Sequence, residues 1–155
     1  MPFSPKYACA FKALNLAWIR IYWDPEPNDF KTLDNPEKMV IEQGGYIVFA
    51  IEENNVLGTC ALLKEDDANF ELAKMAVSGS AQGRGIGWML GDAIITQARK
   101  FGAKRVYLES NTILEPAINL YRKLGFTEFS GHVSPYERCN IQMELFLDND
   151  ANNAG

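Results

Sequence analysis

A glycine loop between a strand-like run and a helix-like run constrains this chain most. Residues 82–87 read Gln-Gly-Arg-Gly-Ile-Gly, after an apolar run at residues 70–77 and before a helical pattern at residues 88–101. Glycine permits a tight turn and lets a ligand approach the backbone, and the free N–H groups of a first helical turn attract an anion. The loop therefore predicts a phosphorylated cofactor. The alternative is that these glycines only allow the helix to pack closely on the sheet.

The spacing of the loop narrows the choice of cofactor. Neither the Gly-x-Gly-x-x-Gly pattern of dinucleotide folds nor the P-loop pattern is present, whereas Gln-x-x-Gly-x-Gly is. A carboxylate-bearing strand at residues 71–77, Asn111, and a Tyr-x-x-x-Gly-Phe segment that begins at Tyr121 accompany it. Together these motifs resemble the GNAT superfamily of acyl-CoA-dependent N-acetyltransferases. The resemblance covers residues 11–147 and is strongest over residues 70–126.

Length and charge limit the class of protein. The chain has 155 residues, of which 47% are hydrophobic, so one sizeable core is expected. We predict one domain over residues 1–147, followed by a polar, disordered tail at residues 148–155. The net charge of −5 argues against nonspecific binding of nucleic acid and favours a cationic substrate.

Cysteine and histidine content argue against a metal. The three cysteines, Cys9, Cys60 and Cys139, are too far apart for a zinc knuckle or a redox pair, and His132 is the only histidine. We therefore expect reduced thiols and no metal. No apolar run is long enough to span a bilayer and no export signal is visible, so the chain is predicted to be cytoplasmic and free of membrane contact.

Hydrophobic periodicity and turn residues set the expected elements. Pro25 and Pro27 are expected to end the first helix, and Asn35 to cap the second. Helices are predicted at residues 11–22, 36–43, 88–101 and 114–124, and strands at 46–51, 56–63, 70–77, 106–110, 127–129 and 140–147. The fold class is α/β. The resemblance implies a single-domain GNAT fold, with a mixed, mostly antiparallel sheet, a central parallel pair of splayed strands, and helices on both faces.

The same periodicity predicts which helical side chains are buried. In the first helix the apolar stripe comprises Phe11, Leu14, Trp18, Ile21 and Tyr22. In the helix after the glycine loop it comprises Ile86, Met89, Leu90, Ala93, Ile94, Ala98 and Phe101.

The resemblance implies acetyl-CoA as cosubstrate. Loop N–H groups would bind its pyrophosphate, and main-chain groups at the end of the strand would pair with its pantetheine arm. An N–H near Met75 or Ala76 would polarise the thioester carbonyl. Asn111 resembles a residue that touches the cofactor, but it also fits as a cap of the next helix. The expected cofactor-binding residues are Met75, Ala76, Val77, Gln82, Gly83, Arg84, Gly85, Ile86, Gly87, Asn111 and Tyr121.

Transfer of an acetyl group to an amine requires a base, since a protonated amine cannot attack. Glu71 matches the general-base glutamate of the histone-acetylating branch of the family, with Glu109 in reserve. Strand alternation places Glu71 on one side with Ala73 and Met75, unless a bulge shifts the register. A salt bridge between Glu71 and Lys74 is the structural alternative.

Tyr121 is the expected acid that gives a proton to the departing thiolate. In the family motif this phenol commonly lies near the cofactor sulfur, and its ordinary pKa near 10 suits that transfer. Tyr121 also fits as a core tyrosine, because it lies at helical spacing from Leu114, Ala117 and Ile118. The two interpretations are compatible.

Direct transfer is favoured over an acyl-enzyme on Cys60, because no histidine lies nearby in sequence to activate that thiol. In the acceptor pocket, Arg138 would bind a carboxylate and Glu137 an amine, unless residues 136–138 form an exposed turn. Taken together, the chain is predicted to be an acetyltransferase that acts on a primary amine of a small molecule in a ternary complex. A protein amine, a non-catalytic acyl-CoA sensor and another nucleotide remain alternatives, and an apolar last strand allows a homodimer.

Overall fold

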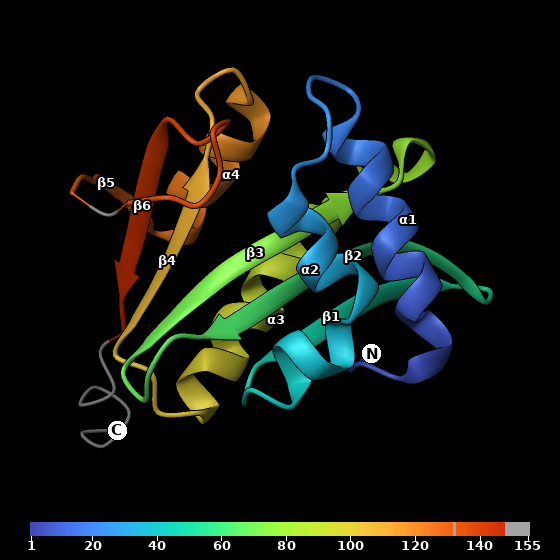
Figure 1. Cartoon of the computed structure of the whole chain (residues 1–155), viewed down its shortest axis with the longest axis horizontal. Coiled ribbons are helices and arrows are strands. Elements are labelled where there is room, and N and C mark those ends of the chain that lie inside the picture. Colours follow the sequence, from blue (N-terminus) through green and yellow to red (C-terminus); the bar gives the residue numbers. More distant parts are fainter. Residues whose placement is uncertain (132, 148–155) are drawn as a thin grey trace.

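A computed structural model describes residues 1–131 and 133–147 (Figure 1). His132 and the tail predicted at residues 148–155 lie outside the described residues. The helices are η1 (Pro5–Tyr7), α1 (Ala8–Ile19), α2 (Pro27–Asp34), η2 (Glu37–Ile41), η3 (Gly79–Ala81), α3 (Ile86–Lys100) and α4 (Glu115–Leu124). The strands are β1 (Tyr46–Glu52), β2 (Asn55–Lys64), β3 (Asn69–Val77), β4 (Arg105–Ser110), β5 (Thr127–Phe129) and β6 (Ile141–Phe146).

The described strands form one mixed sheet in the order β1-β2-β3-β4-β6-β5. Only β3 and β4 run parallel, and every other neighbouring pair is antiparallel. This arrangement confirms the predicted α/β fold with a central parallel pair. Strand β6, the apolar last strand from which a homodimer was predicted, lies between β4 and β5 and pairs with both, and the homodimer stays a prediction.

Helices cover both faces of the sheet, as predicted (Figure 1). Helices α3 and α4 pack on one face, where their apolar side chains and those of β2, β3, β4 and β6 form the larger core. Helices α1 and α2 and the turn η2 lie on the other face, over a smaller core that includes Phe11, Leu33, Val40, Ile47 and Phe49. Among the described residues no helix is both long and apolar enough to cross a membrane.

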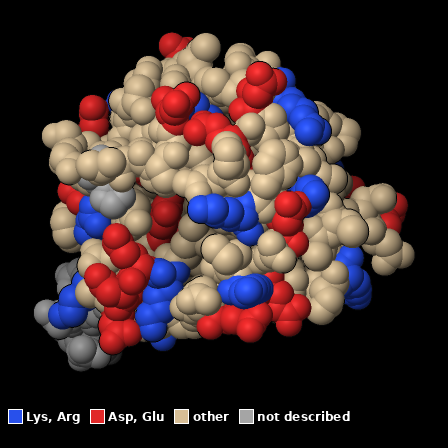
Figure 2. Space-filling view, viewed as in Figure 1, with Lys and Arg blue, Asp and Glu red and all other residues tan. Residues whose placement is uncertain are grey.

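Charged side chains are distributed over the surface. Figure 2 shows acidic and basic groups mixed on the viewed face, without a large region of one sign. The net charge of −5 is thus not concentrated in one exposed patch of this face.

The buried stripe of α3 differs from the prediction at two positions. Met89 is 61% exposed and Phe101 is 41% exposed, whereas Gly91 and Ile95 are buried. The helix turns the row Ile86, Leu90, Ile94 and Ala98 toward the sheet, and Gly91 and Ile95 are buried beside this row. The apolar pattern of the sequence therefore predicted a stripe that is rotated about the helix axis relative to the buried face.

The stripe of α1 was also predicted off its true centre. Helix α1 ends at Ile19, so Ile21 and Tyr22 are outside it and more than half exposed. Its buried residues are Phe11, Asn15 and Ile19, which are spaced by four. A polar residue therefore occupies the middle of the buried row, and its Nδ2 donates a hydrogen bond to the carbonyl of Phe11.

Helix α2 was not predicted, because Pro27 was interpreted as the end of a helix. Proline instead occupies the first position of α2, where its missing N–H costs nothing. Glu26 and Asp29 form a reciprocal capping box that satisfies N–H groups of the first turn. The helix predicted after Asn35 is the short π-helical turn η2, and Asn35 makes no side-chain cap there.

Candidate active site

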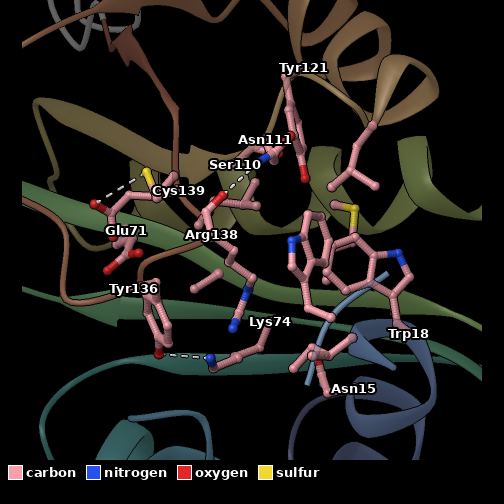
Figure 3. A pocket seen from close by; sticks show the side chains of 17 residues that line it. Asn15, Trp18, Glu71, Lys74, Ser110, Asn111, Tyr121, Tyr136, Arg138 and Cys139 are labelled. Carbon is pink, nitrogen blue, oxygen red and sulfur yellow. Dashed lines mark hydrogen bonds between the residues drawn. The ribbon is translucent and has the colours of Figure 1, made fainter. Parts of the chain in front are cut away.

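The parallel pair β3 and β4 separates halfway along its length. Asn69, Phe70 and Glu71 pair with β4, but the rest of β3 has no β4 partner. A pocket opens where the strands part, and residues from α1, α4 and the segment before β6 close it (Figure 3). The splay pocket, as we name it, is lined by Asn15, Trp18, Ile19, Trp23, Glu71, Leu72, Ala73, Lys74, Met75, Glu109, Ser110, Asn111, Leu114, Tyr121, Tyr136, Arg138 and Cys139.

A β-bulge on β3 redirects the side chains beside the pocket. Ala61 pairs with Ala73 but Thr59 pairs with Ala76, so β3 holds one extra residue. Lys74 takes the left-handed backbone conformation, with φ of 54°. Glu71 and Met75 consequently do not share a side, and Met75 packs against the core under α3. The simple strand alternation is wrong here, for the reason that the sequence analysis allowed.

Glu71 lies on β3 at the last position paired with β4, and its carboxylate borders the pocket (Figure 3). Burial raises its pKa to about 8, and the nearby charge of Glu109 adds to the increase. The ammonium of Lys74 opposes this shift without cancelling it. Glu71 therefore has a pKa suited to a base that works near neutral pH.

Tyr121 comes from α4, on the side of the pocket opposite Glu71 (Figure 3). Its ring packs edge-on against Phe126, and the residue is 8% exposed. Its hydroxyl points into the pocket and has no hydrogen-bond partner among the described residues. Because burial raises the pKa of this phenol, it keeps its proton and remains available as a donor.

A buried ion cluster forms another wall of the pocket. The carboxylate of Asp29, fully buried on α2, accepts hydrogen bonds from Arg138 Nη1 and Nη2 at 2.8 and 2.6 Å and from Lys74 Nζ at 2.9 Å. Lys74 Nζ also donates to the Tyr136 hydroxyl at 2.8 Å. Burial opposes ionisation of Asp29, but the hydrogen bond from Arg138 and the charge of Lys74 outweigh it and lower the pKa to about 2.

This cluster connects three distant parts of the chain. It joins α2, β3 and the segment before β6, and Glu26 strengthens the connection through Arg138 Nη1 and the N–H of Glu137. Glu137 itself is exposed and does not line the pocket, so the predicted amine-binding role finds no support. Tyr136 and Arg138 do line it, and the exposed-turn interpretation is wrong for these two residues.

The glycine loop begins after η3 and leads into α3. Gly83 and Gly85 have φ of 83° and 75°, and a Cβ built at either position meets nothing within 4 Å. Gly85 caps α3, whose first N–H groups have no partner within the helix. The loop is thus an open cradle of backbone beside a helix N-terminus, which fits a pyrophosphate.

Gly87 and Gly91, which lie within α3, serve close helix packing. A Cβ at Gly87 would lie 3.1 Å from Leu120, and one at Gly91 would lie 2.6 Å from Leu124. These two positions let α3 approach α4 and Met75 closely, so close packing explains them as well as ligand binding does. Through Met75, which lines the splay pocket, the start of α3 is connected to that pocket.

We expect Gly85→Ala to weaken acetyl-CoA binding by roughly five- to tenfold. A left-handed residue with a Cβ costs about 1 kcal/mol or more, so the loop would leave the shape it has here. Gly79→Ala is the matched control, because its Cβ also meets no atom within 4 Å but its φ is not positive. Calorimetric titration of both variants measures the effect, and equal affinities would mean that the loop shape does not determine cofactor binding.

The remaining predicted cofactor residues are placed as follows. Val77 and Gln82 line a second, wider groove beside α1 instead of the splay pocket. Ala76 and Ile86 are buried, and Arg84 forms an exposed ion pair with Glu52.

Asn111 lines the splay pocket. Its hydrogen bonds show whether its side chain caps the following helix, α4. Its Nδ2 donates to the carbonyl of Arg138, and its Oδ1 accepts from the N–H of Ile113. It therefore organises the turn before α4 but does not cap the helix, whose N-cap is Leu114.

Cys60 is completely buried, which confirms that it is unsuited to an acyl-enzyme. Glu109, the reserve base, faces the pocket and accepts a hydrogen bond from Gln142. In residues 1–131 and 133–147, no group of three or more acidic, cysteine or histidine side chains is placed to hold a metal ion.

Several residues of the site were not predicted from the sequence. Asn15, Trp18 and Trp23 near α1 and Cys139 before β6 line the pocket, and Asp29 on α2 lies behind it as the buried partner of Lys74 and Arg138. A local sequence signal existed only for Asp29. The segment Glu26-Pro27-Asn28-Asp29 has the Glu-Pro-x-Asp pattern of a helix start, which predicts a capping role for Asp29.

Comparison with known proteins identifies relatives. A family model described as "Acetyltransferase (GNAT) family" matches residues 15–126. The chain is 32% identical over 114 residues to the uncharacterised N-acetyltransferase YjgM of Escherichia coli (strain K12). That match covers 67% of this chain and 66% of YjgM, which is just under two thirds of the relative's length.

Solved structures share the fold. An acetyltransferase of the GNAT family from Staphylococcus aureus Mu50 superposes with a TM-score of 0.86 at 21% identity, over 96% of this chain and 98% of that one. YncA of Salmonella typhimurium, solved with its cofactor acetyl-CoA, superposes with a TM-score of 0.76 at 21% identity, over 96% and 92% of the two chains. The fold is therefore that of known acetyltransferases.

Proposed function

The chain belongs to the acetyltransferase (GNAT) family, and from this premise we propose that it transfers the acetyl group of acetyl-CoA to a primary amine of a small molecule. One observation carries the proposal. The splay pocket brings together Glu71, a carboxylate whose pKa is raised to about 8, and Tyr121, a phenol that keeps its proton, although they are separated by 50 positions in sequence.

The glycine loop would hold the cosubstrate. Its open backbone at Gly83 and Gly85, at the N-terminus of α3, suits the pyrophosphate. Acetyl-CoA supplies an acyl group on a good leaving thiol. Beyond the last β4 pairing, β3 has free backbone groups on one side, and these would pair with the pantetheine amides up to Met75.

The proton transfers follow from the two side chains. Glu71 accepts a proton from the acceptor ammonium, and the free amine forms a C–N bond to the acetyl carbon while the C–S bond breaks. The nitrogen then releases its surplus proton to solvent and becomes the neutral amide. Tyr121 donates its proton to the departing sulfur and is reprotonated from solvent. The bulge at Lys74 turns the backbone beside the pocket, where an N–H near Met75 would stabilise charge on the carbonyl oxygen.

The walls of the pocket support a small acceptor over a protein amine. The cluster around Asp29 joins α2 to the segment before β6, so side chains enclose the pocket from several sides. A protein tail would need an open groove in this place. All three cysteines are free thiols, which supports the cytoplasm as the location.

Calorimetric titration with acetyl-CoA tests the proposal, with CoA, NAD and ATP as comparators. We expect saturable binding of acetyl-CoA and CoA and none of NAD. Release of free thiol from acetyl-CoA in the presence of amines then reports transfer. If no CoA species binds, the glycine loop is only a packing device and the proposal fails. If acetyl-CoA binds but no amine releases thiol, the chain is an acyl-CoA sensor.

A further inference from the structure

The cations of the splay pocket are already neutralised. Arg138 Nη1 donates to carboxylates of Asp29 and Glu26, and Nη2 donates to Asp29. Lys74 Nζ is shared between Asp29 and the Tyr136 hydroxyl. A substrate carboxylate would have to compete with a buried carboxylate for these donors, and that exchange is costly because it leaves Asp29 unpaired. The earlier expectation that Arg138 binds a carboxylate of the acceptor is therefore not favoured.

The pocket carboxylates, in contrast, have unused acceptor capacity. Glu71 accepts no hydrogen bond from any described residue, although it is largely withdrawn from solvent. Glu109 accepts at Oε2 alone, from Gln142 at 3.2 Å and from the thiol of Cys139 at 4.0 Å. The charge of Glu109 raises the electrostatic cost of ionising Glu71. A cationic ligand between them would remove that cost.

Aromatic rings complete the lining. The rings of Trp18 and Trp23 pack at 6.4 Å between centroids with a tilt of 42°, and both residues border the pocket. Indole faces pack well against methylene groups and also attract ammonium ions. The pocket thus combines apolar surface for an alkyl chain with two carboxylates for positive groups.

We propose that the acceptor is an alkyl diamine or polyamine, whose reacting amine lies at Glu71 and whose second ammonium group pairs with Glu109. This inference rests on the proposed acetyl transfer and specifies its substrate class. The reacting ammonium gives its proton to Glu71 before attack, while the second ammonium stays charged and fixes the chain. An α-amino acid is rejected, because its carboxylate finds no free cation among the described residues that line the pocket.

A matched series of acceptors tests the substrate class on the whole protein. It comprises the diaminoalkanes with three to five carbons, n-butylamine, which lacks the second ammonium, and ornithine, which adds a carboxylate to diaminobutane. We expect kcat/KM for the best diamine to exceed that for n-butylamine by at least about tenfold, the usual effect of a hydrogen bond to a charged group. Ornithine should be a poorer substrate than diaminobutane.

Glu109→Gln assigns the effect to one carboxylate. The variant keeps the shape and removes the charge, so the ratio of KM for the diamine to KM for n-butylamine, which has no second ammonium to lose, should rise about tenfold. Asp92→Asn, on the exposed side of α3, is the control and should leave the ratio of the two KM values unchanged.

The outcomes separate this inference from the proposed function. Acetylation of n-butylamine or ornithine as efficiently as of every diamine would overturn the diamine assignment and leave the acetyltransferase intact. A diamine preference that survives Glu109→Gln would overturn the role of Glu109. Failure of acetyl-CoA to bind would overturn the proposed function, and the diamine assignment with it.

Discussion

Tyr121→Phe should lower kcat for acetyl transfer by about a hundredfold, the lower end of the usual contribution of a positioned general acid. The hydroxyl of Tyr121 points into the splay pocket and has no partner among the described residues. Burial raises its pKa, so the proton is present throughout the physiological pH range. Removing the oxygen leaves the departing sulfur without a donor, while the ring keeps its edge-on contact with Phe126.

The affinity for acetyl-CoA separates catalysis from packing. We expect the Kd of Tyr121→Phe by calorimetry to stay within about twofold of the parent value, because the substitution removes no apolar surface. Tyr46→Phe makes the same chemical change on β1, outside the pocket, and should leave kcat unchanged. A loss of cofactor affinity in Tyr121→Phe with kcat preserved would mean that this tyrosine is a core residue and not the acid.

The parts of the fold that follow from short-range patterns were predicted well from the sequence. The strands at residues 46–51, 56–63 and 70–77 have β-branched or apolar runs bounded by turn residues, and each lies within a strand of the structure. The loop before α3 was predicted from its glycines, and Gly83 and Gly85 have positive φ. Neighbouring residues in the sequence determine these elements, so a single sequence is enough to predict them.

The site depends on contacts that no local pattern encodes. Arg138 and Asp29 are separated by 109 positions, and nothing near either residue predicts the hydrogen bonds between them. The bulge at Lys74 has no glycine to announce it, because a lysine takes the left-handed conformation there. Helix α2 is a different case, since its capping box was visible in the sequence but Pro27 was interpreted as the end of the preceding helix. Glu71 and Tyr121, the expected base and acid, both line the pocket. The ion cluster of Asp29, Lys74 and Arg138 was not predicted.

The second large effect concerns Glu71 and pH. We expect kcat to rise with pH, by about tenfold per pH unit at low pH, and to level off near pH 8, because a base must be deprotonated before it accepts the proton of the amine. Burial raises the pKa of Glu71 to about 8, and Glu109 contributes further. Glu109→Gln should accordingly move the inflection to lower pH.

Glu71→Gln should lower kcat at pH 8 by about a hundredfold or more and abolish the inflection, since the amide cannot accept the proton. Stability should change in the opposite direction. The pKa of Glu71 is raised from 4.5 to about 8 on folding, so the unfolded chain releases this proton first, and the free energy of unfolding falls as pH rises through that interval. Glu71→Gln removes this dependence, so its Tm should exceed that of the parent above pH 8. A pH profile that keeps its inflection in the glutamine variant would assign the base to another group, and a Tm below that of the parent at pH 9 would show that the carboxylate stabilises the fold.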